Sequence, residues 1–125
     1  MNYEISPPRV ALALLLAATL FALLTAGGAT AVAASNCGGL PDYPSSKGGY
    51  FQTLQVTQIS CKTGKSLMRS HYTCRVKHGL KGHCTSVRGY RCTEKRGLAI
   101  PTEYSGRVTC KAGSKRFVYT YQQNL

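Results

Sequence analysis

The chain has 125 residues, with 16 lysines and arginines against four aspartates and glutamates, six cysteines and no tryptophan. Because a typical domain needs about 100–150 residues, this length excludes a multidomain enzyme. The formal net charge of +12 at neutral pH indicates an attraction to anionic partners.

An uncharged, largely apolar segment runs from Val10 to Ala34. It follows a short polar start and ends in small residues, which is the order of features in a secretory signal peptide. We therefore predict that residues 1–34 are a signal peptide, with cleavage before Ala34 or Ser35. An uncleaved membrane anchor is the alternative, because the apolar run is long enough to cross a bilayer.

Cleavage after Ala34 leaves 91 of the 125 residues, which keep the whole charge of +12 and all six cysteines. An exported domain of this size meets an oxidising environment, where an even number of cysteines predicts a disulfide framework. Sequence leaves the pairing open, beyond a preference for a local bridge between Cys74 and Cys84. The predicted disulfide partners are Cys37, Cys61, Cys74, Cys84, Cys92 and Cys110.

The alternative for the segment around Cys74 is a zinc site. Cys74, His78, His83 and Cys84 place two thiols and two imidazoles close together, which is suitable ligand chemistry for zinc. Their spacing matches no strong zinc signature, and exported thiols oxidise. We therefore expect disulfides here, and neither a metal nor a cofactor.

The mature chain opens with an extended lead-in, predicted over 35–49 because prolines, serines and glycines crowd it. Loosely alternating polar and apolar residues then predict a strand over 50–59. Ser60 is a suitable N-cap, and apolar spacing predicts the only mature helix over 61–72. Gly64 lies on the apolar side of this helix, which predicts a close approach to a sheet.

Residues 75–85 carry two glycines and three lysine or arginine side chains, so we expect a basic surface loop. Three strands follow, joined first by a long connection over 94–105 and then by a tight turn over 112–114. Within the long connection, Leu98-Ala99-Ile100 could extend an edge strand. The predicted strands cover 86–93, 107–111 and 115–122. Residues 50–125 are thus expected to form an α+β domain, with one helix packed on a small, mainly antiparallel sheet of about four strands and stapled by disulfides.

Several short motifs lie along these expected elements. They are Ser60-Cys61, Gly64, Gly89-Tyr90-Arg91-Cys92, Val108-Thr109-Cys110 and Phe117-Val118-Tyr119. In this order they resemble small, cysteine-containing exported domains that are common in actinobacteria, over about residues 50–121. Cys37 and the second loop cysteine are outside the shared pattern. The resemblance implies secretion and fold, and it implies no catalytic residue.

The excess of basic side chains predicts a secreted, non-enzymatic binding domain whose partner is an anionic polymer or the cell envelope. No specific nucleic acid is indicated, and no membrane span is expected in the mature chain. Tyrosines could offer stacking surfaces, but strand alternation predicts that they fill the small core. The candidate anion-binding residues are Lys62, Lys65, Arg69, Arg75, Lys77, Lys81, Arg88 and Arg91.

Two other classes of function are alternatives. A secreted protein-binding module, such as an inhibitor or a cationic antimicrobial, would present the loop between Cys74 and Cys84. A ribonuclease-like hydrolase would need two titrating groups on either side of a phosphate, and no pair has a signature spacing. Its candidates are His71, His78, His83, Glu94 and Glu103. Gly64-Lys65-Ser66 is not a phosphate-binding loop, because residue 59 is isoleucine where that motif needs glycine.

Overall fold

The computed structural model describes residues 30–44 and 48–125 of the chain. Most of the predicted signal peptide, residues 1–34, therefore lies outside the described residues, and 30–34 form no helix or strand. No helix in the described part is both long and apolar enough to cross a bilayer. The elements are β1 (Ser35–Asn36), β2 (Gly49–Thr57), α1 (Cys61–Val76), β3 (Ser86–Val87), β4 (Tyr90–Ile100), β5 (Glu103–Ala112) and β6 (Lys115–Asn124).

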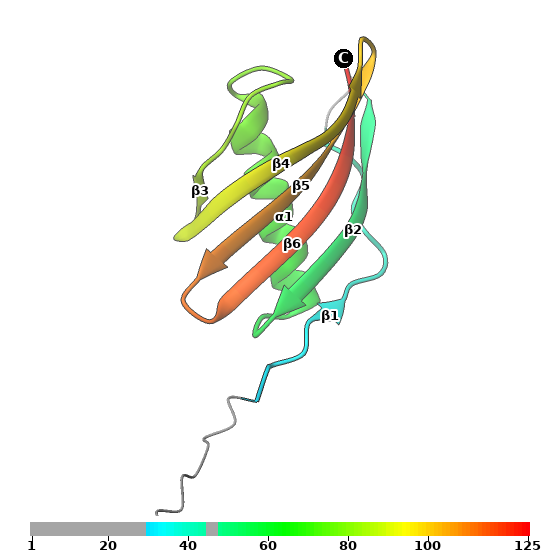
Figure 1. Ribbon diagram of the computed structural model, residues 1–125. Coiled ribbons are helices and arrows are strands. Elements are labelled where there is room, and N and C mark those ends of the chain that lie inside the picture. Colours follow the sequence, from blue (N-terminus) through cyan, green and yellow to red (C-terminus); the bar gives the residue numbers. More distant parts are fainter. Residues whose placement is uncertain (1–29, 45–47) are drawn as a thin grey trace, which may run out of the picture.

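The strands form one antiparallel sheet in the order β1-β2-β6-β5-β4-β3. Figure 1 shows that α1 packs against one face of this sheet and that no described segment covers the other face. The predicted class, one helix on an antiparallel sheet with disulfides, is confirmed. The sheet has six strands, more than the predicted number, because the lead-in adds β1 and the strand expected over 86–93 divides into β3 and β4.

The division between β3 and β4 is a two-residue turn at Arg88-Gly89. Both residues have positive φ angles, 47° and 85°. This left-handed backbone joins two antiparallel strands tightly, and glycine adopts it readily. Val87, Tyr90 and Cys92 predicted a single strand over 86–93, but Val87 and Tyr90 are three residues apart, so the alternation breaks at the turn.

The prediction of a long connection over 94–105 is wrong, although Leu98-Ala99-Ile100 do extend a strand, as the alternative allowed. Pro101-Thr102 alone separates β4 from β5, so this segment is a β-hairpin. Gly97 lies where the β4–β5 ladder shifts register. Proline in a turn and glycine at a bulge are both compatible with paired strands, although they read as loop signals along the sequence.

The helix begins as predicted. The Ser60 hydroxyl caps it by accepting a hydrogen bond from the amide three residues later, at 3.1 Å. Gly64 faces the sheet, where an added Cβ atom would collide with the Val56 side chain, so the predicted close approach is confirmed. The end predicted at Tyr72 is one turn too early, because α1 continues to Val76.

The extra helical turn moves Arg75 out of the predicted surface loop over 75–85. Arg75 is 0% exposed and lies four residues after His71, on the buried side of α1. The prediction that Arg75 binds anions at the surface is therefore wrong. A charged residue at an inward position leaves no apolar signal, so hydrophobic spacing could not place it.

The lead-in predicted over 35–49 is attached to the sheet at its start. β1 pairs with β2, and the Cys37 amide donates a hydrogen bond to the Leu54 carbonyl at 2.8 Å. Cys37 also forms a disulfide with Cys61, the first residue of α1. This segment is therefore held against both layers of the domain.

All six cysteines form disulfides, as predicted. The bridges are Cys37–Cys61, Cys74–Cys84 and Cys92–Cys110. The preferred local bridge between Cys74 and Cys84 is confirmed, and their bond to each other rules out the zinc alternative for these two thiols. Three disulfides in so short a chain indicate an oxidising environment.

Aromatic rings dominate the core between α1 and the sheet. Phe117, Tyr119 and Tyr121 alternate along β6, point toward the helix layer and are almost fully buried. The expectation that the tyrosines fill the core is confirmed for Tyr72, Tyr90, Tyr104, Tyr119 and Tyr121. Their rings are therefore not available for stacking on a ligand.

Candidate anion-binding groove on the helix

A basic groove runs along the outer side of α1, away from the sheet. Its volume is about 680 Å³, and four of its nine lining residues are lysine or arginine. The lining residues are Pro41, Lys62, Lys65, Ser66, Arg69, Ser70, Thr73, Cys74 and Lys77. None of these nine is acidic, so the groove is a continuous cationic surface with hydroxyl groups between the charges.

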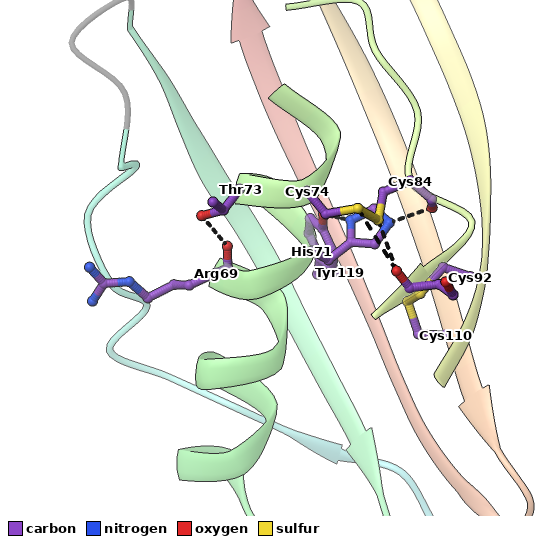
Figure 2. The surroundings of a disulfide bond; sticks show 9 residues. Arg69, His71, Thr73, Cys74, Cys84, Cys92, Cys110 and Tyr119 are labelled. Atoms are coloured by element: carbon purple, nitrogen blue, oxygen red, sulfur yellow. Dashed lines mark hydrogen bonds between the residues drawn. A yellow bond between two sulfur atoms is a disulfide. The ribbon is translucent and has the colours of Figure 1, made fainter. Parts of the chain in front are cut away.

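Helical periodicity brings the cations together. Lys62, Lys65 and Arg69 are three and four residues apart, so they lie along one side of a helix. Lys77 caps the C-terminal end of α1 and closes the row. Figure 2 shows Arg69 extending from α1 on the side away from the sheet, while His71 points toward the sheet.

No carboxylate in the described part of the chain neutralises this row. Both of the salt bridges found there involve Glu94, and neither includes a groove residue. The Thr73 hydroxyl donates to the Arg69 backbone carbonyl at 3.1 Å (Figure 2). The Arg69 side chain itself is exposed. Four unpaired cations along one groove raise the local concentration of anions.

The structure separates the eight candidate anion-binding residues into groups. Four of them line the groove: Lys62, Lys65, Arg69 and Lys77. Arg88 lies at its edge, where the guanidinium donates to the Ser66 hydroxyl at 2.9 Å. Lys81 is exposed in the loop after α1. Arg91 belongs to the uncovered face of the sheet, and Arg75 is buried.

Buried Arg75 is a polar centre that sequence reasoning missed. Its Nη1 donates to the Leu80 carbonyl at 2.8 Å and to the Tyr104 hydroxyl at 2.5 Å. Its Nη2 donates to the Tyr43 hydroxyl and to Gln123 Oε1, both at 2.9 Å. The only sequence signal was its place four residues after His71, one turn further along the same side of the helix.

The candidate catalytic residues do not assemble into one open site. His71 is fully buried, with Nδ1 2.6 Å from the Tyr119 hydroxyl and Nε2 2.9 Å from the Cys84 carbonyl. His83 Nδ1 lies 3.0 Å from Glu94 Oε2, but that carboxylate is already bound by Arg96 and by the Tyr121 hydroxyl. His78 is an exposed loop residue, and Glu103 accepts a hydrogen bond from Gln122 at the start of β5.

Acidification is expected to destabilise the domain in two steps. Burial lowers the pKa of His71 below its ordinary value of 6.5, so the folded state resists the proton that the unfolded state binds. Burial alone would raise the pKa of Glu94, but hydrogen bonds from Tyr121 and Arg96 outweigh it and hold this pKa below 4.5. The free energy of unfolding should therefore be constant just above pH 6.5. It should decrease as the pH drops below 6.5, and decrease again at lower pH as Glu94 is protonated.

Urea unfolding from about pH 2 to pH 8 measures both declines, because the second begins only below pH 4.5. His71→Gln should remove the first decline and keep the second, because glutamine does not titrate. Equal stability of the wild-type domain at pH 7.5 and 5 would contradict the account of His71.

The comparisons with known proteins return no relative. No protein-family model matches the chain, and no curated protein or solved structure matches it significantly. The resemblance to small exported actinobacterial domains therefore stays a prediction. The function must be argued from the groove, its charges and its setting in the fold.

Proposed function

We propose that this protein is a secreted, non-enzymatic domain that binds anionic polymers through the groove on α1. The observation that carries the proposal is a groove lined by four cations, none of which forms a salt bridge with another described residue, and by no acid among its nine lining residues. Such a surface attracts polyanions by screened Coulomb forces. The three disulfides support export, because they require an oxidising compartment.

The shape of the groove favours a linear ligand over a small anion. Lys62 and Lys77 lie at the two ends of α1, and a rise of about 1.5 Å per residue places them roughly 22 Å apart. Several repeats of a polymer would contact the row at once. Arg69 adds a planar fork that can bind a phosphate or carboxylate group through two hydrogen bonds.

A charge-matched pair of variants tests this site. Lys65→Gln/Arg69→Gln should bind labelled polyphosphate about tenfold more weakly, and the slope of log K against log salt should fall by about two, one for each lost contact. Lys81→Gln/Lys115→Gln removes the same charge outside the groove and should bind nearly as the wild type does. Fluorescence anisotropy across a salt series measures both quantities.

Two outcomes would contradict the proposal. If both double variants lose the same affinity, the net charge binds polyanions and the groove does not. If wild-type affinity hardly changes between low and moderate salt, the attraction is not electrostatic.

A further inference from the structure

Figure 1 shows that the face of the sheet opposite α1 is uncovered. This face carries a second set of cations. Arg91 on β4 is directly opposite Lys111 on β5, which is directly opposite Arg116 on β6. All three side chains are exposed. Three cations therefore stand in one row across three neighbouring strands, with their backbones about 4.8 Å apart from strand to strand.

A second cationic row crosses the same face. Lys95 on β4 is directly opposite Arg107 on β5, and both are exposed. Lys95 follows Arg91 by four residues, so strand alternation places it on the same face about 13 Å further along. Thr93 and Thr109 lie opposite each other between the two rows.

These rows are unfavourable for the sheet alone. Like charges directly opposite each other on neighbouring strands destabilise the pairing. Neither row contains an acid, and the two salt bridges in the described part of the chain involve neither row. An anionic ligand lying on this face would relieve the repulsion, which is the charge complementarity expected of a binding surface.

Each row borders a shallow hollow. Arg91, Thr93, Thr109 and Lys111 enclose about 380 Å³. A second hollow of about 270 Å³ has Lys95, Arg107 and Thr120 among its lining residues. Neither hollow has an aromatic ring in its lining, so bases would find no stacking partner there. Arginine forks, ammonium groups and hydroxyls instead match the oxygens of phosphate groups.

We propose that this sheet face is a second anion site, which binds a linear phosphate polymer without bases, and that the domain joins two such chains. The inference rests on the proposed function of the α1 groove. Figure 1 shows α1 and the sheet as separate layers. The groove lies on the side of α1 away from the sheet, and the rows are exposed on the face of the sheet away from α1, so the two face opposite directions. A straight polymer segment in the groove cannot reach the rows, so simultaneous occupation needs two segments.

Three variants with equal charge separate the two sites. The sheet variant is Lys111→Gln/Arg116→Gln, the groove variant is Lys65→Gln/Arg69→Gln, and the control is Lys81→Gln/Lys115→Gln. Calorimetric titration with a short polyphosphate counts chains bound per protein, and light scattering with a long polyphosphate measures joining of chains. Wild type and control should bind two short chains and form large particles. The sheet and groove variants should each bind one chain and scatter about tenfold less.

The results distinguish the two proposals. A wild type that binds one short chain, which the groove variant loses and the sheet variant keeps, overturns the second site and leaves the groove in place. A sheet variant that still binds two chains and forms large particles does the same. A wild type that binds no polyphosphate overturns both. Single-stranded DNA of equal charge that binds the sheet face more tightly than polyphosphate would show that bases are read, which overturns the choice of ligand.

Thermal unfolding gives an independent measure of the repulsive row. Replacing its central cation, Lys111→Thr, should raise Tm by ~2–4 °C at low salt, because the opposed charges are relieved. The difference should vanish in about 1 M salt, where the Debye length is only about 3 Å. A variant no more stable than the wild type at low salt would remove the electrostatic argument for a bound anion.

Discussion

Reduction of the three disulfides is expected to unfold this domain at low ionic strength. The bridges join cysteines 24, 10 and 18 residues apart. Each contributes about 3 kcal/mol by restricting the unfolded chain. Their combined contribution is comparable with the whole free energy of unfolding of an ordinary domain, about 5–15 kcal/mol. Few small domains would remain folded after such a loss.

The positions of the bridges strengthen this expectation. Cys37 follows the two-residue strand β1, and Cys84 precedes the two-residue strand β3. Strands so short contribute few backbone hydrogen bonds, so the disulfides hold both edges of the domain to α1. The net charge of +12 acts in the same direction, because mutual repulsion favours the expanded chain.

Circular dichroism of the reduced and alkylated protein should show the loss of tyrosine near-ultraviolet signal together with the loss of secondary structure. Cys74→Ala/Cys84→Ala is the control, because it removes one bridge, should cost about 3 kcal/mol in urea unfolding and should leave the domain folded. Moderate salt should recover part of the structure of the reduced protein by screening. A reduced protein that keeps its near-ultraviolet signal at low salt would refute the role given to the bridges.

The groove was predictable because its cations are close in sequence. Lys62, Lys65 and Arg69 share one side of any helix that includes them, so helical spacing alone placed them together. Lys77 could be named as a basic residue but not located, because the length of α1 was underestimated by one turn. Local periodicity thus predicts a surface made by one element, and it fails where the element ends.

The cationic rows of the sheet could not be read in the same way. Arg91, Lys111 and Arg116 come from three strands, and only the register of the ladders sets them opposite one another. Register depends on where each hairpin turns, and the β4–β5 turn was predicted as a long connection. A surface assembled across strands therefore needs the pairing, which sequence periodicity does not contain.

Replacing Arg75 by methionine is expected to lower the free energy of unfolding by about 3–5 kcal/mol. The guanidinium is fully buried, has no carboxylate partner in the described part of the chain, and is held by four neutral acceptors. Methionine fills most of the space but donates no hydrogen bond. The Leu80 carbonyl keeps a donor in Tyr104 and Gln123 Oε1 keeps one in Tyr43. The expected loss therefore comes from the four missing hydrogen bonds, at about 1 kcal/mol each, and it outweighs the relief of no longer burying a charge.

The acceptors come from separate parts of the chain, so losing the Arg75 hydrogen bonds should destabilise several segments of the domain. Tyr43 lies in the lead-in, Leu80 in the loop after α1 and Gln123 at the end of β6. Burial raises the pKa of Tyr43 well above its usual value, so its phenol stays neutral and accepts from Arg75. The arginine is thus a central tie that adds to the direct Tyr43–Gln123 and Tyr104–Leu80 hydrogen bonds between these segments.

Two further variants distinguish hydrogen bonding from charge and from volume. Arg75→Lys keeps the positive charge, but one ammonium group cannot span the positions of two guanidinium nitrogens, so it should also lose at least about 2 kcal/mol. Lys81→Met places the same methionine in the exposed loop and should change stability by less than about 0.5 kcal/mol. Urea unfolding measures the free energy of unfolding of these two variants and of Arg75→Met.

Hydrogen exchange should locate the damage in Arg75→Lys, with faster exchange in residues 40–44 and 77–83, the segments that the guanidinium holds. If Arg75→Met unfolds within 1 kcal/mol of the wild type, the buried cation is not a structural tie. Its four hydrogen bonds would then merely offset the free energy of burying it, as happens when an ionic centre is replaceable by a well-packed apolar side chain.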